Sequence, residues 1–280
     1  LTLHVTRKIC MFADDCVIYH TINNITDPDI LQQNLNYVQF WCTRWLMTLN
    51  PKKCKHISFT CSPSPITSPY MIANSLIDTV LSFKYVGVVL ISFHLNWGTH
   101  INSILLSANQ SLGFLRRHLR HAPRNIRLLA YITLIRPKVE YVSRIWDPYQ
   151  KYLINALESL QNRATRFIHS SYSYDVSISA LKEKSKLQSL LHRRTISSFG
   201  LFYKFLYSLL NRMSYITPPS RISQRTGHPL QVSKQRTHTT TFSTSFFSRT
   251  ASEWNALLHH NVSTNNRHMF YAAVSSVIPN

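Results

Sequence analysis

The chain has 280 residues and carries 31 lysines and arginines against 11 acidic residues, a net charge of +20 at neutral pH. An excess of this size favours a polyanionic partner, most simply nucleic acid. The hydrophobic content of 44% excludes an extended disordered chain. Five glycines, with neither a GxGxxG nor a GxxxxGK[ST] pattern, argue against Rossmann and P-loop enzymes.

The cysteines are odd in number and include no CxxC pair; they are Cys10, Cys16, Cys42, Cys54 and Cys61. We therefore expect neither a disulfide framework nor a zinc ribbon, and a reducing, intracellular compartment. We expect no signal peptide, and no apolar run is long enough to cross a bilayer, so no membrane partner is expected. Because the chain begins at Leu1, we expect it to be a piece of a longer protein.

The charge is unevenly distributed along the chain. Residues 1–50 contain three basic and four acidic residues, a net charge of −1, whereas residues 51–280 contain 28 and seven, a net charge of +21. One interpretation is a metal-binding patch next to a surface that binds phosphate backbones. The alternative is a neutral domain fused to a basic tail, but the apolar periodicity of the basic part argues against a mere tail.

The first part of the chain predicts strands and one helix. Two short apolar runs, Ile9–Ala13 and Cys16–His20, predict a hairpin whose turn is Asp14-Asp15. Asp27-Pro28 predicts a helix start, and the helix ends before Asn50-Pro51. Further strands are predicted at Lys55–Thr60, Tyr70–Ala73 and Val80–Leu90, with a Pro/Ser loop at Ser62–Pro69.

After Trp97 the apolar period becomes that of helices. Helices are predicted at Ile101–Leu119, at Asn125–Ile135 (halted before Pro137), at Leu153–Ile168, over Ser177–Leu210 as one or two segments, and at Arg249–His259. Thr217–Thr241 holds three prolines and is predicted to be a linker or extended arm. The order of elements is α+β first and then all-α.

The adjacent carboxylates of the predicted hairpin are the strongest chemical feature. Asp14 and Asp15 repel each other at a tight turn, and divalent cations relieve this repulsion best. Mg²⁺ prefers one or two carboxylates together with substrate phosphates, and a pair of such ions can activate a hydroxyl and stabilise a leaving pyrophosphate. The alternative is an Asp-Asp turn that satisfies only its own backbone.

Several short motifs together resemble the reverse transcriptases of non-LTR (LINE-type) retrotransposons. The run Cys10–Tyr19 resembles their FADD active-site hairpin, Leu49–Lys55 their "LN..K.K" segment, and Phe83–Val88 their "KYLG" primer-grip strand. The remaining matches follow in the expected order: His94–Trp97 with His100-Ile101, Ile145–Tyr149, Leu157–Ala164, Arg249 and Trp254-Asn255. The similarity covers nearly the whole chain.

The resemblance implies roles for individual residues. Asp14 would be the principal Mg²⁺ ligand and Asp15 its partner, and either Lys53 or Lys55 would contact the incoming triphosphate. Tyr85, Val86 and Gly87 would form a primer-grip segment near the primer 3′ end. The reaction implied is attack of a DNA primer 3′-hydroxyl on a deoxynucleotide α-phosphate, with an RNA template, and a nuclear location is favoured.

The resemblance also implies a division of the chain and a missing part. We expect a partial palm of antiparallel strands with one packed helix (residues 1–97), a thumb-like helical bundle (98–170) and a basic helical C-terminal region (171–280) with a linker near 217–241. Members of the family place another metal-binding aspartate upstream, together with fingers and an endonuclease. Because this chain starts 13 residues before Asp14, we expect the isolated chain to have no polymerase activity.

Basic residues concentrate in the predicted helices. Eight basic residues and one acid lie between Arg116 and Arg144. On Ile101–Leu119, Arg116 and Arg120 lie one turn apart and Arg117 lies off the leucine face, an arrangement that presents guanidinium groups to a phosphate backbone. The alternative is a solvated helix face. The predicted nucleic-acid-binding residues, which in a thumb would contact primer and template, are Arg116, Arg117, Arg120, Arg124 and Arg127. A second run of basic residues is expected to form one more basic face, which either adds to the RNA-binding surface or is simply exposed to solvent. Its residues are Lys182, Lys184, Lys186, Arg193 and Arg194. The tryptophans are expected mainly in the core: Trp41, Trp45, Trp97, Trp146 and Trp254.

An alternative function remains open at this point. The chain could be a catalytically inert remnant of a retrotransposon that keeps only electrostatic affinity for nucleic acid. Mg²⁺-dependent duplex binding that Asp14→Asn weakens would favour the polymerase fragment, and metal-independent, salt-sensitive binding the remnant. A third, unrelated possibility is a structural protein whose basic helices bind an acidic partner.

Overall fold

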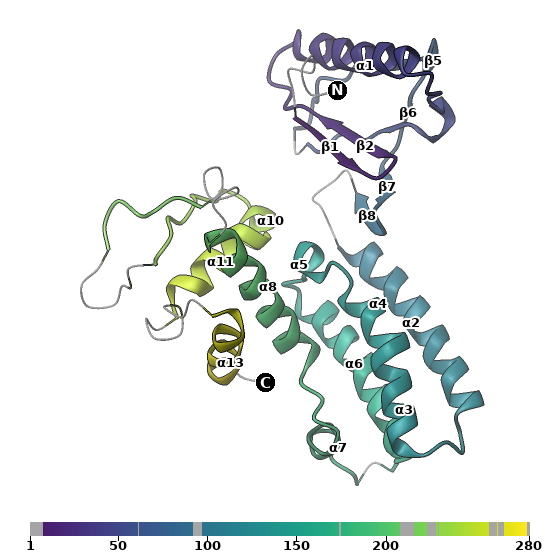
Figure 1. The fold of residues 1–280 in the computed structure, drawn as a ribbon, viewed down its shortest axis with the longest axis vertical. Coiled ribbons are helices and arrows are strands. Elements are labelled where there is room, and N and C mark those ends of the chain that lie inside the picture. The colour runs from purple at the N-terminus through teal and green to yellow at the C-terminus, as the bar shows by residue number, and fades with distance from the viewer. Residues whose placement is uncertain are drawn as a thin grey trace. The chain divides into compact units, whose positions relative to one another are not determined.

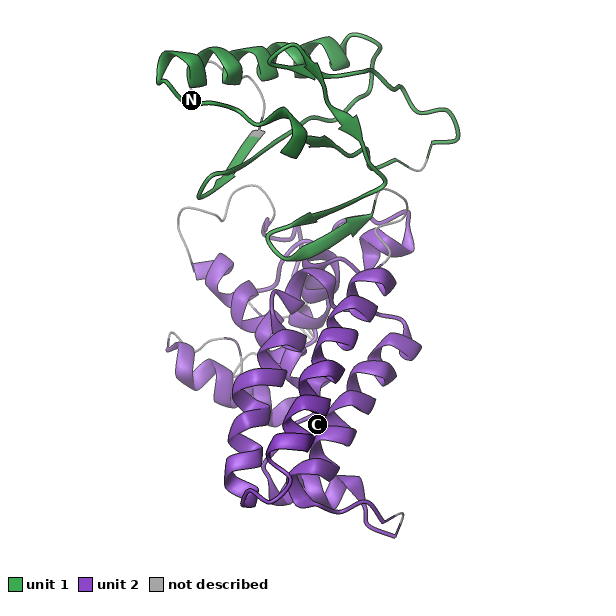
Figure 2. Ribbon diagram, turned by 90° about the vertical axis from the view of Figure 1, so that its right-hand side faces the viewer, with its two compact units in different colours: residues 1–96 green, residues 97–280 purple. Residues whose placement is uncertain are grey.

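The computed structural model describes residues 8–60, 62–91, 97–173, 175–207, 216–222, 228, 230–257, 262 and 266–278. The chain divides into two compact units, residues 1–96 and residues 97–280 (Figure 2). The first unit contains short strands and one long helix, and the second is helical (Figure 1). The predicted order of α+β followed by all-α is confirmed. No helix in the described ranges is both long and apolar enough to span a bilayer.

The strands of the first unit form two-stranded pairs. Its elements are β1 (Lys8–Phe12), β2 (Asp15–Tyr19), α1 (Asp27–Arg44), the 3-10 helix η1 (Pro51–Lys53), β3 (Lys55–His56), β4 (Met71–Ile72), β5 (Ser75–Leu76), β6 (Asp78–Thr79), β7 (Ser82–Tyr85) and β8 (Val88–Ile91). The pairs β1–β2, β4–β5 and β7–β8 are antiparallel, and β1–β2 is the predicted hairpin. The predicted strand Val80–Leu90 instead turns back at Val86-Gly87 and forms β7 and β8. The pair β3–β6 is parallel, which corrects the expectation of antiparallel strands alone. Its strands come from chain segments joined by a long excursion rather than by a hairpin turn.

Helix α1 begins where the sequence predicts but ends earlier. Pro28 occupies the first turn, where its missing N–H costs nothing. The helix ends at Arg44 because Leu46 adopts the left-handed conformation, with φ 54°. The N–H of Met47 then donates to the carbonyl of Cys42 at 2.8 Å, and that of Leu46 to Thr43 at 3.2 Å. This is the Schellman arrangement, which satisfies the last carbonyls of a helix.

A small core joins α1 to the strands of the first unit. Tyr70, Ile72 and Ile77 are buried, and Leu31 and Leu35 of α1 pack against them. The Gln32 side chain also pairs with the Met71 backbone, donating to its carbonyl and accepting from its N–H, both at 2.8 Å. A helix side chain thus replaces a neighbouring strand along one edge of β4, and satisfies backbone groups that would otherwise lack partners.

The second unit is built from helices that bury apolar side chains against one another. They are α2 (Gly98–His118), α3 (Arg124–Ala130), the π-helix η2 (Tyr131–Ile135), α4 (Arg136–Glu140), α5 (Ser143–Trp146), α6 (Lys151–His169), α7 (Ile178–Lys184), α8 (Leu190–Tyr207), α10 (Thr240–Ser243), α11 (Phe246–Asn255) and α13 (Arg267–Val277). The predicted helices at 101–119 and 153–168 are confirmed as α2 and α6. The predicted span 177–210 forms α7 and α8, and its last three residues lie outside the described ranges.

The helical path continues through Pro137, where the sequence predicts a stop. Five residues of π-helix, Tyr131–Ile135, separate α3 from α4, and Pro137 lies in the first turn of α4. In an α-helix, proline cannot donate the backbone hydrogen bond and its ring collides with the carbonyl four residues earlier. The wider π-helical turn before Pro137 avoids the lost hydrogen bond and the collision. The prediction of a helix end at Ile135 was therefore wrong, because the backbone widens instead of breaking.

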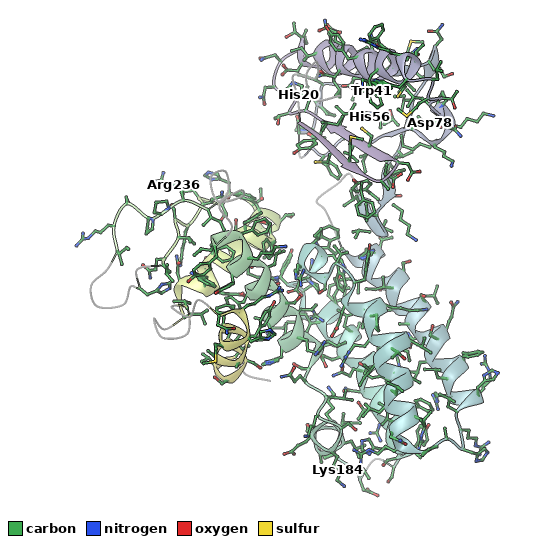
Figure 3. All side chains as sticks on the ribbon, in the orientation of Figure 1. His20, Trp41, His56, Asp78, Lys184 and Arg236 are labelled. Atoms are coloured by element: carbon green, nitrogen blue, oxygen red, sulfur yellow. The ribbon has the colours of Figure 1, made fainter. Side chains whose placement is uncertain are left out.

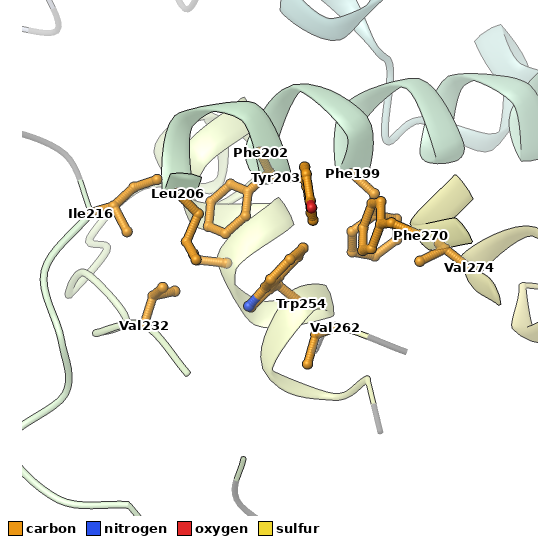
Figure 4. Close-up of a cluster of buried hydrophobic side chains, with 11 residues drawn as sticks. Phe199, Phe202, Tyr203, Leu206, Ile216, Val232, Trp254, Val262, Phe270 and Val274 are labelled. Carbon is orange, nitrogen blue, oxygen red and sulfur yellow. The ribbon is translucent and has the colours of Figure 1, made fainter. Parts of the chain in front are cut away.

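The last part of the chain packs around Trp254 (Figure 4). Phe202 of α8 and Phe270 of α13 lie 5.3 and 5.6 Å from the Trp254 ring, centroid to centroid. Val232 is buried in the same cluster, so the described part of the predicted linker near 217–241 lies partly in the core, and its last two residues belong to α10. The predicted helix at 249–259 is α11, which begins earlier, at Phe246. Residues 258–259 lie outside the described ranges, and α13 is a helix that the sequence reading missed.

The tryptophans divide between core and surface. Trp146 and Trp254 are fully buried, as predicted. Trp45, in contrast, is 63% exposed, because α1 ends just before it. The prediction of a core position was wrong for this residue. Its ring lies 6.2 Å from that of Trp41, measured between centroids.

Candidate functional site

The FADD segment forms the predicted antiparallel hairpin. Phe12 pairs with Asp15 across the hairpin, so the two-residue turn is Ala13-Asp14, and Asp15 is the first residue of β2. This shifts the predicted turn by one residue. Ala13 has a φ of 52°, a conformation that costs a non-glycine residue about 1 kcal/mol. Asp14 therefore lies at the turn itself and Asp15 at the beginning of a strand.

Both carboxylates of the hairpin are exposed to solvent. In the described part of the chain, neither takes part in an ion pair or a side-chain hydrogen bond. Mg²⁺ is typically bound by one or two carboxylates together with substrate phosphates, and carboxylates without basic partners are available as such ligands. The residues present therefore fit part of a magnesium site. The described ranges contain no group of three or more His, Cys, Asp or Glu side chains that could hold a metal.

The neighbouring thiol does not extend this donor set. Burial raises the pKa of Cys16, and the nearby thiols of Cys42, Cys10 and Cys54 raise it further. A thiol with a raised pKa stays protonated at neutral pH, whereas a metal ligand must be a thiolate. These four cysteines carry free thiols, and Cys61 lies outside the described ranges. Oxygen donors are thus the chemistry that the hairpin offers.

The two candidate lysines have different surroundings. Lys55 lies on β3, and its Nζ is 2.6 Å from the Asp78 carboxylate on the paired strand β6. Lys53 lies at the end of η1, whose first turn is capped by the Asn50 side chain accepting from the Lys52 N–H at 3.1 Å. The Lys53 side chain is exposed. Of the two lysines, Lys53 is therefore the one that can bind an anion without first breaking an ion pair.

The three primer-grip candidates lie at the turn of the β7–β8 hairpin. Tyr85 ends β7 and pairs with Val88, and Val86 and Gly87 form the turn between them. Both turn residues have positive φ, 45° and 83° respectively. Glycine adopts this conformation freely, but a β-branched valine is strained in it. The turn thus holds Val86 in an unfavourable backbone conformation, a feature that often accompanies functional positions.

The arginines of the second unit separate into exposed and occupied groups. Arg116, Arg117 and Arg120 are exposed at the end of α2 and in the loop after it. The Arg116 guanidinium lies over the Tyr172 ring, 5.3 Å from its centroid. Arg124 is also exposed, and one of its nitrogens donates to the Lys184 carbonyl at 2.6 Å. These four residues remain available for contact with a phosphate backbone.

Arg127 is a correction to the predicted set. Its side chain is buried and donates to the Phe167 carbonyl at 2.8 Å and to the Ser170 hydroxyl. Phe167 lies in the last turn of α6, where carbonyl groups lack partners within the helix. Arg127 therefore caps α6, and its guanidinium does not face solvent. Helical spacing alone could not reveal this contact, because it joins residues 40 positions apart.

The second basic run is also divided. Lys184 and Lys186 are exposed. Lys182 pairs with Glu158 at 3.1 Å, and Arg193 pairs with Glu140 through both carboxylate oxygens. The interpretation of the whole run as one basic face is therefore wrong for Arg193 and for Arg194.

Arg194 belongs to a buried ion cluster that sequence reasoning missed. Asp147 accepts from Arg194 Nε at 2.7 Å through one carboxylate oxygen and from Arg249 Nη2 at 2.7 Å through the other. The side chains of Asp147 and Arg194 are only 4% and 1% exposed. The contact joins two motifs of the sequence resemblance, Ile145–Tyr149 and Arg249. The sequence offered one signal for this contact: each of the two motifs places a charged residue among apolar ones.

Comparison with known proteins gives two curated relatives. The chain is 29% identical over 165 residues to "Probable RNA-directed DNA polymerase from transposon BS" of Drosophila melanogaster, covering 57% of this chain and 18% of that protein. It is 24% identical over 164 residues to the RNA-directed DNA polymerase from mobile element jockey of Drosophila funebris, with the same coverage of both. The resemblance to polymerases of non-LTR retrotransposons is thereby confirmed. No family model and no solved structure matches the chain.

Proposed function

We propose that this chain is a segment of an RNA-directed DNA polymerase of a non-LTR retrotransposon, with part of the palm in the first unit and the thumb in the second. The observation that carries the proposal is the hairpin: it presents Asp14 at an exposed turn, with Asp15 next to it. The two relatives support the same conclusion. Because the chain spans about a fifth of their length, the activity belongs to a longer protein.

The candidate site residues of both units have proposed roles in nucleotidyl transfer. Asp14 and Asp15 supply carboxylate oxygens to Mg²⁺, which when bound lowers the charge of the triphosphate and assists the primer hydroxyl. Lys53 contacts the triphosphate of the incoming nucleotide. The Tyr85–Gly87 turn supports the primer end. The exposed arginines of α2 and the following loop contact the phosphates of primer and template without reading their sequence.

The metal site is tested by titrating the chain with Mn²⁺, a paramagnetic substitute for Mg²⁺. We expect amide signals of Ala13–Cys16 to broaden first, and Asp14→Asn to weaken binding at least tenfold. Asp29→Asn is the matched control, because Asp29 is an exposed aspartate of α1. Equal weakening by both substitutions, or broadening that spares the hairpin, would contradict the proposal.

An inert nucleic-acid-binding remnant is the second candidate function. The observation that favours it is that the described ranges contain no group of three side chains able to bind a metal. Binding of an RNA–DNA duplex with and without Mg²⁺ separates the two functions. Mg²⁺-dependent binding that Asp14→Asn weakens supports the polymerase segment, and metal-independent, salt-sensitive binding supports the remnant.

The isolated chain is expected to lack polymerase activity under either function. Two aspartates alone give an incomplete two-metal site. Incorporation of deoxynucleotides on a primed RNA template is the measurement. Template-dependent incorporation that Asp14→Ala abolishes would overturn this expectation.

A further inference from the structure

Two basic segments that lie far apart in the sequence meet at one end of the second unit. The contact that joins them is the hydrogen bond from Arg124, at the start of α3, to the carbonyl of Lys184, at the end of α7, 60 residues later. The ends of α6 and α7 also meet there, since His169 and Ser185 lie 2.7 Å apart, ring nitrogen to hydroxyl. Figure 3 labels Lys184 at this end of the helical unit.

The side chains gathered at this end are mainly cationic. We call the basic end the six exposed residues Arg116, Arg117, Arg120, Arg124, Lys184 and Lys186. The exposed acids near them in sequence are Asp175 and Glu183. Burial is the main cause that lowers the pKa of His169, and the cations Arg124, Lys184 and Arg127 lower it further. Charges from both segments therefore act on the same point.

An aromatic ring lies within the basic end. Tyr172 is 52% exposed, and the Arg116 guanidinium stacks over its ring. A duplex offers phosphates to such a surface but keeps its bases stacked inside. A single strand offers both phosphates and free base faces, and exposed aromatic rings among cations bind such bases by stacking. The combination of chemistries therefore fits a single strand better than a duplex.

We propose that the basic end binds a single-stranded nucleic acid, whose phosphates contact its six cationic side chains and one of whose bases stacks on Tyr172. This site lies wholly within the second unit. It uses the exposed arginines to which the proposed polymerase function assigns phosphate contacts, and no residue of the Asp14–Asp15 hairpin. It would serve equally a polymerase segment or an inert remnant.

Binding is measured by fluorescence anisotropy with a 16-nucleotide single-stranded RNA of mixed sequence, in the absence of Mg²⁺. With six phosphate contacts, the logarithm of affinity should fall with the logarithm of salt concentration with a slope of about −4. Lys184→Gln combined with Lys186→Gln should weaken binding about tenfold and reduce the slope by about 1.4. Lys234→Gln combined with Arg236→Gln is the control, since it removes the same charge from an exposed segment elsewhere in the unit.

Stacking is tested separately at Tyr172. Tyr172→Ala should weaken single-strand binding about tenfold, whereas Tyr172→Phe, which keeps the ring, should change it less than twofold. Asp14→Asn should leave binding unchanged, so this test can fail or succeed independently of the metal site. Equal loss in the lysine variant and its control would overturn the proposal. So would tighter binding of a 16-base-pair duplex, or equally effective competition by polyglutamate.

Discussion

The two units differ most in how much of their apolar surface they bury. Among the described residues, six hydrophobic side chains are buried in the first unit and 29 in the second. The strands of the first unit occur in separate pairs, and its hairpin exposes Met11 and Phe12 at 59% and 62%. The second unit thus has the core of an independently stable domain, while the first displays its candidate catalytic groups on a lightly packed scaffold.

Aspartates illustrate the same difference at the level of single groups. Asp147 in the second unit is buried between Arg194 and Arg249 and is committed to structure. Asp14 and Asp15 in the first unit are exposed and keep their oxygens available for another partner. A buried carboxylate with two arginines is expensive to disturb, whereas an exposed pair costs little to change. The residue type alone therefore says little about role.

The largest expected effect is the loss of the shared carboxylate in the second unit. Asp147→Ala leaves Arg194 and Arg249 without their common partner, and we expect a destabilisation of about 3–5 kcal/mol. Urea unfolding followed by tryptophan fluorescence measures it, since Trp146 and Trp254 are both buried in this unit. Asp175→Ala, at an exposed position, should change stability by less than about 0.5 kcal/mol. A loss below about 1 kcal/mol for Asp147→Ala would contradict a structural role.

A matched pair of core substitutions sharpens the comparison of the units. Ile135 in the second unit is fully buried, whereas Ile77 in the first is 7% exposed in a small cluster. Ile135→Ala should cost about 4 kcal/mol and Ile77→Ala about 2 kcal/mol, because a smaller core relaxes more easily around a cavity. Two separate unfolding transitions, each shifted by one substitution, are expected in calorimetry. A single transition that both substitutions shift equally would show that the units unfold together.

The smallest expected effect is a pH dependence in the first unit. Hydrogen bonds from the N–H groups of Asn23 and Asn24 to the Asp27 carboxylate, each 2.8 Å, lower the pKa of Asp27. A lowered folded-state pKa gives a stabilisation that is present above about pH 4, the ordinary range of an aspartate, and is lost as the pH falls through the folded-state value. Asp27→Asn should remove this acid-range slope of stability in urea unfolding. Asp29→Asn should retain it, and an unchanged slope in Asp27→Asn would refute the assignment.

Much of the fold could be predicted from the sequence because periodic leucines determine it. The apolar positions of α2 and α6 repeat at helical spacing, and the FADD hairpin has two short apolar runs around its turn. The helix through Pro137 could not be predicted in the same way, since the π-helix that accommodates it has no spacing signal. Helix α13 was missed because Ser275, Ser276 and Val277 weaken its helical propensity, and contacts with α8 stabilise it instead.

The candidate site was predictable to the extent that it is local. Asp14, Asp15 and the Val86-Gly87 turn lie within hairpins, where neighbouring residues determine the geometry. The roles of arginines depend on distant partners. Arg127 caps a helix 40 residues away, and Arg194 meets a carboxylate 47 residues away. A count of positive charges could not separate these side chains from Arg117 and Arg120, which remain exposed.

The buried Asp147 cluster has a consequence for synthesis of the chain on the ribosome. Asp147 emerges first, Arg194 follows 47 residues later, and Arg249 arrives 102 residues after the carboxylate. Until α11 has been made, the nascent bundle holds only one of the two arginines. The second arginine can complete the cluster only when the aromatic cluster around Trp254 forms, because both lie on the same helix. Translation that stops before Arg249 would therefore release a bundle in which Arg194 alone pairs with Asp147 and the second oxygen of that buried carboxylate lacks its partner.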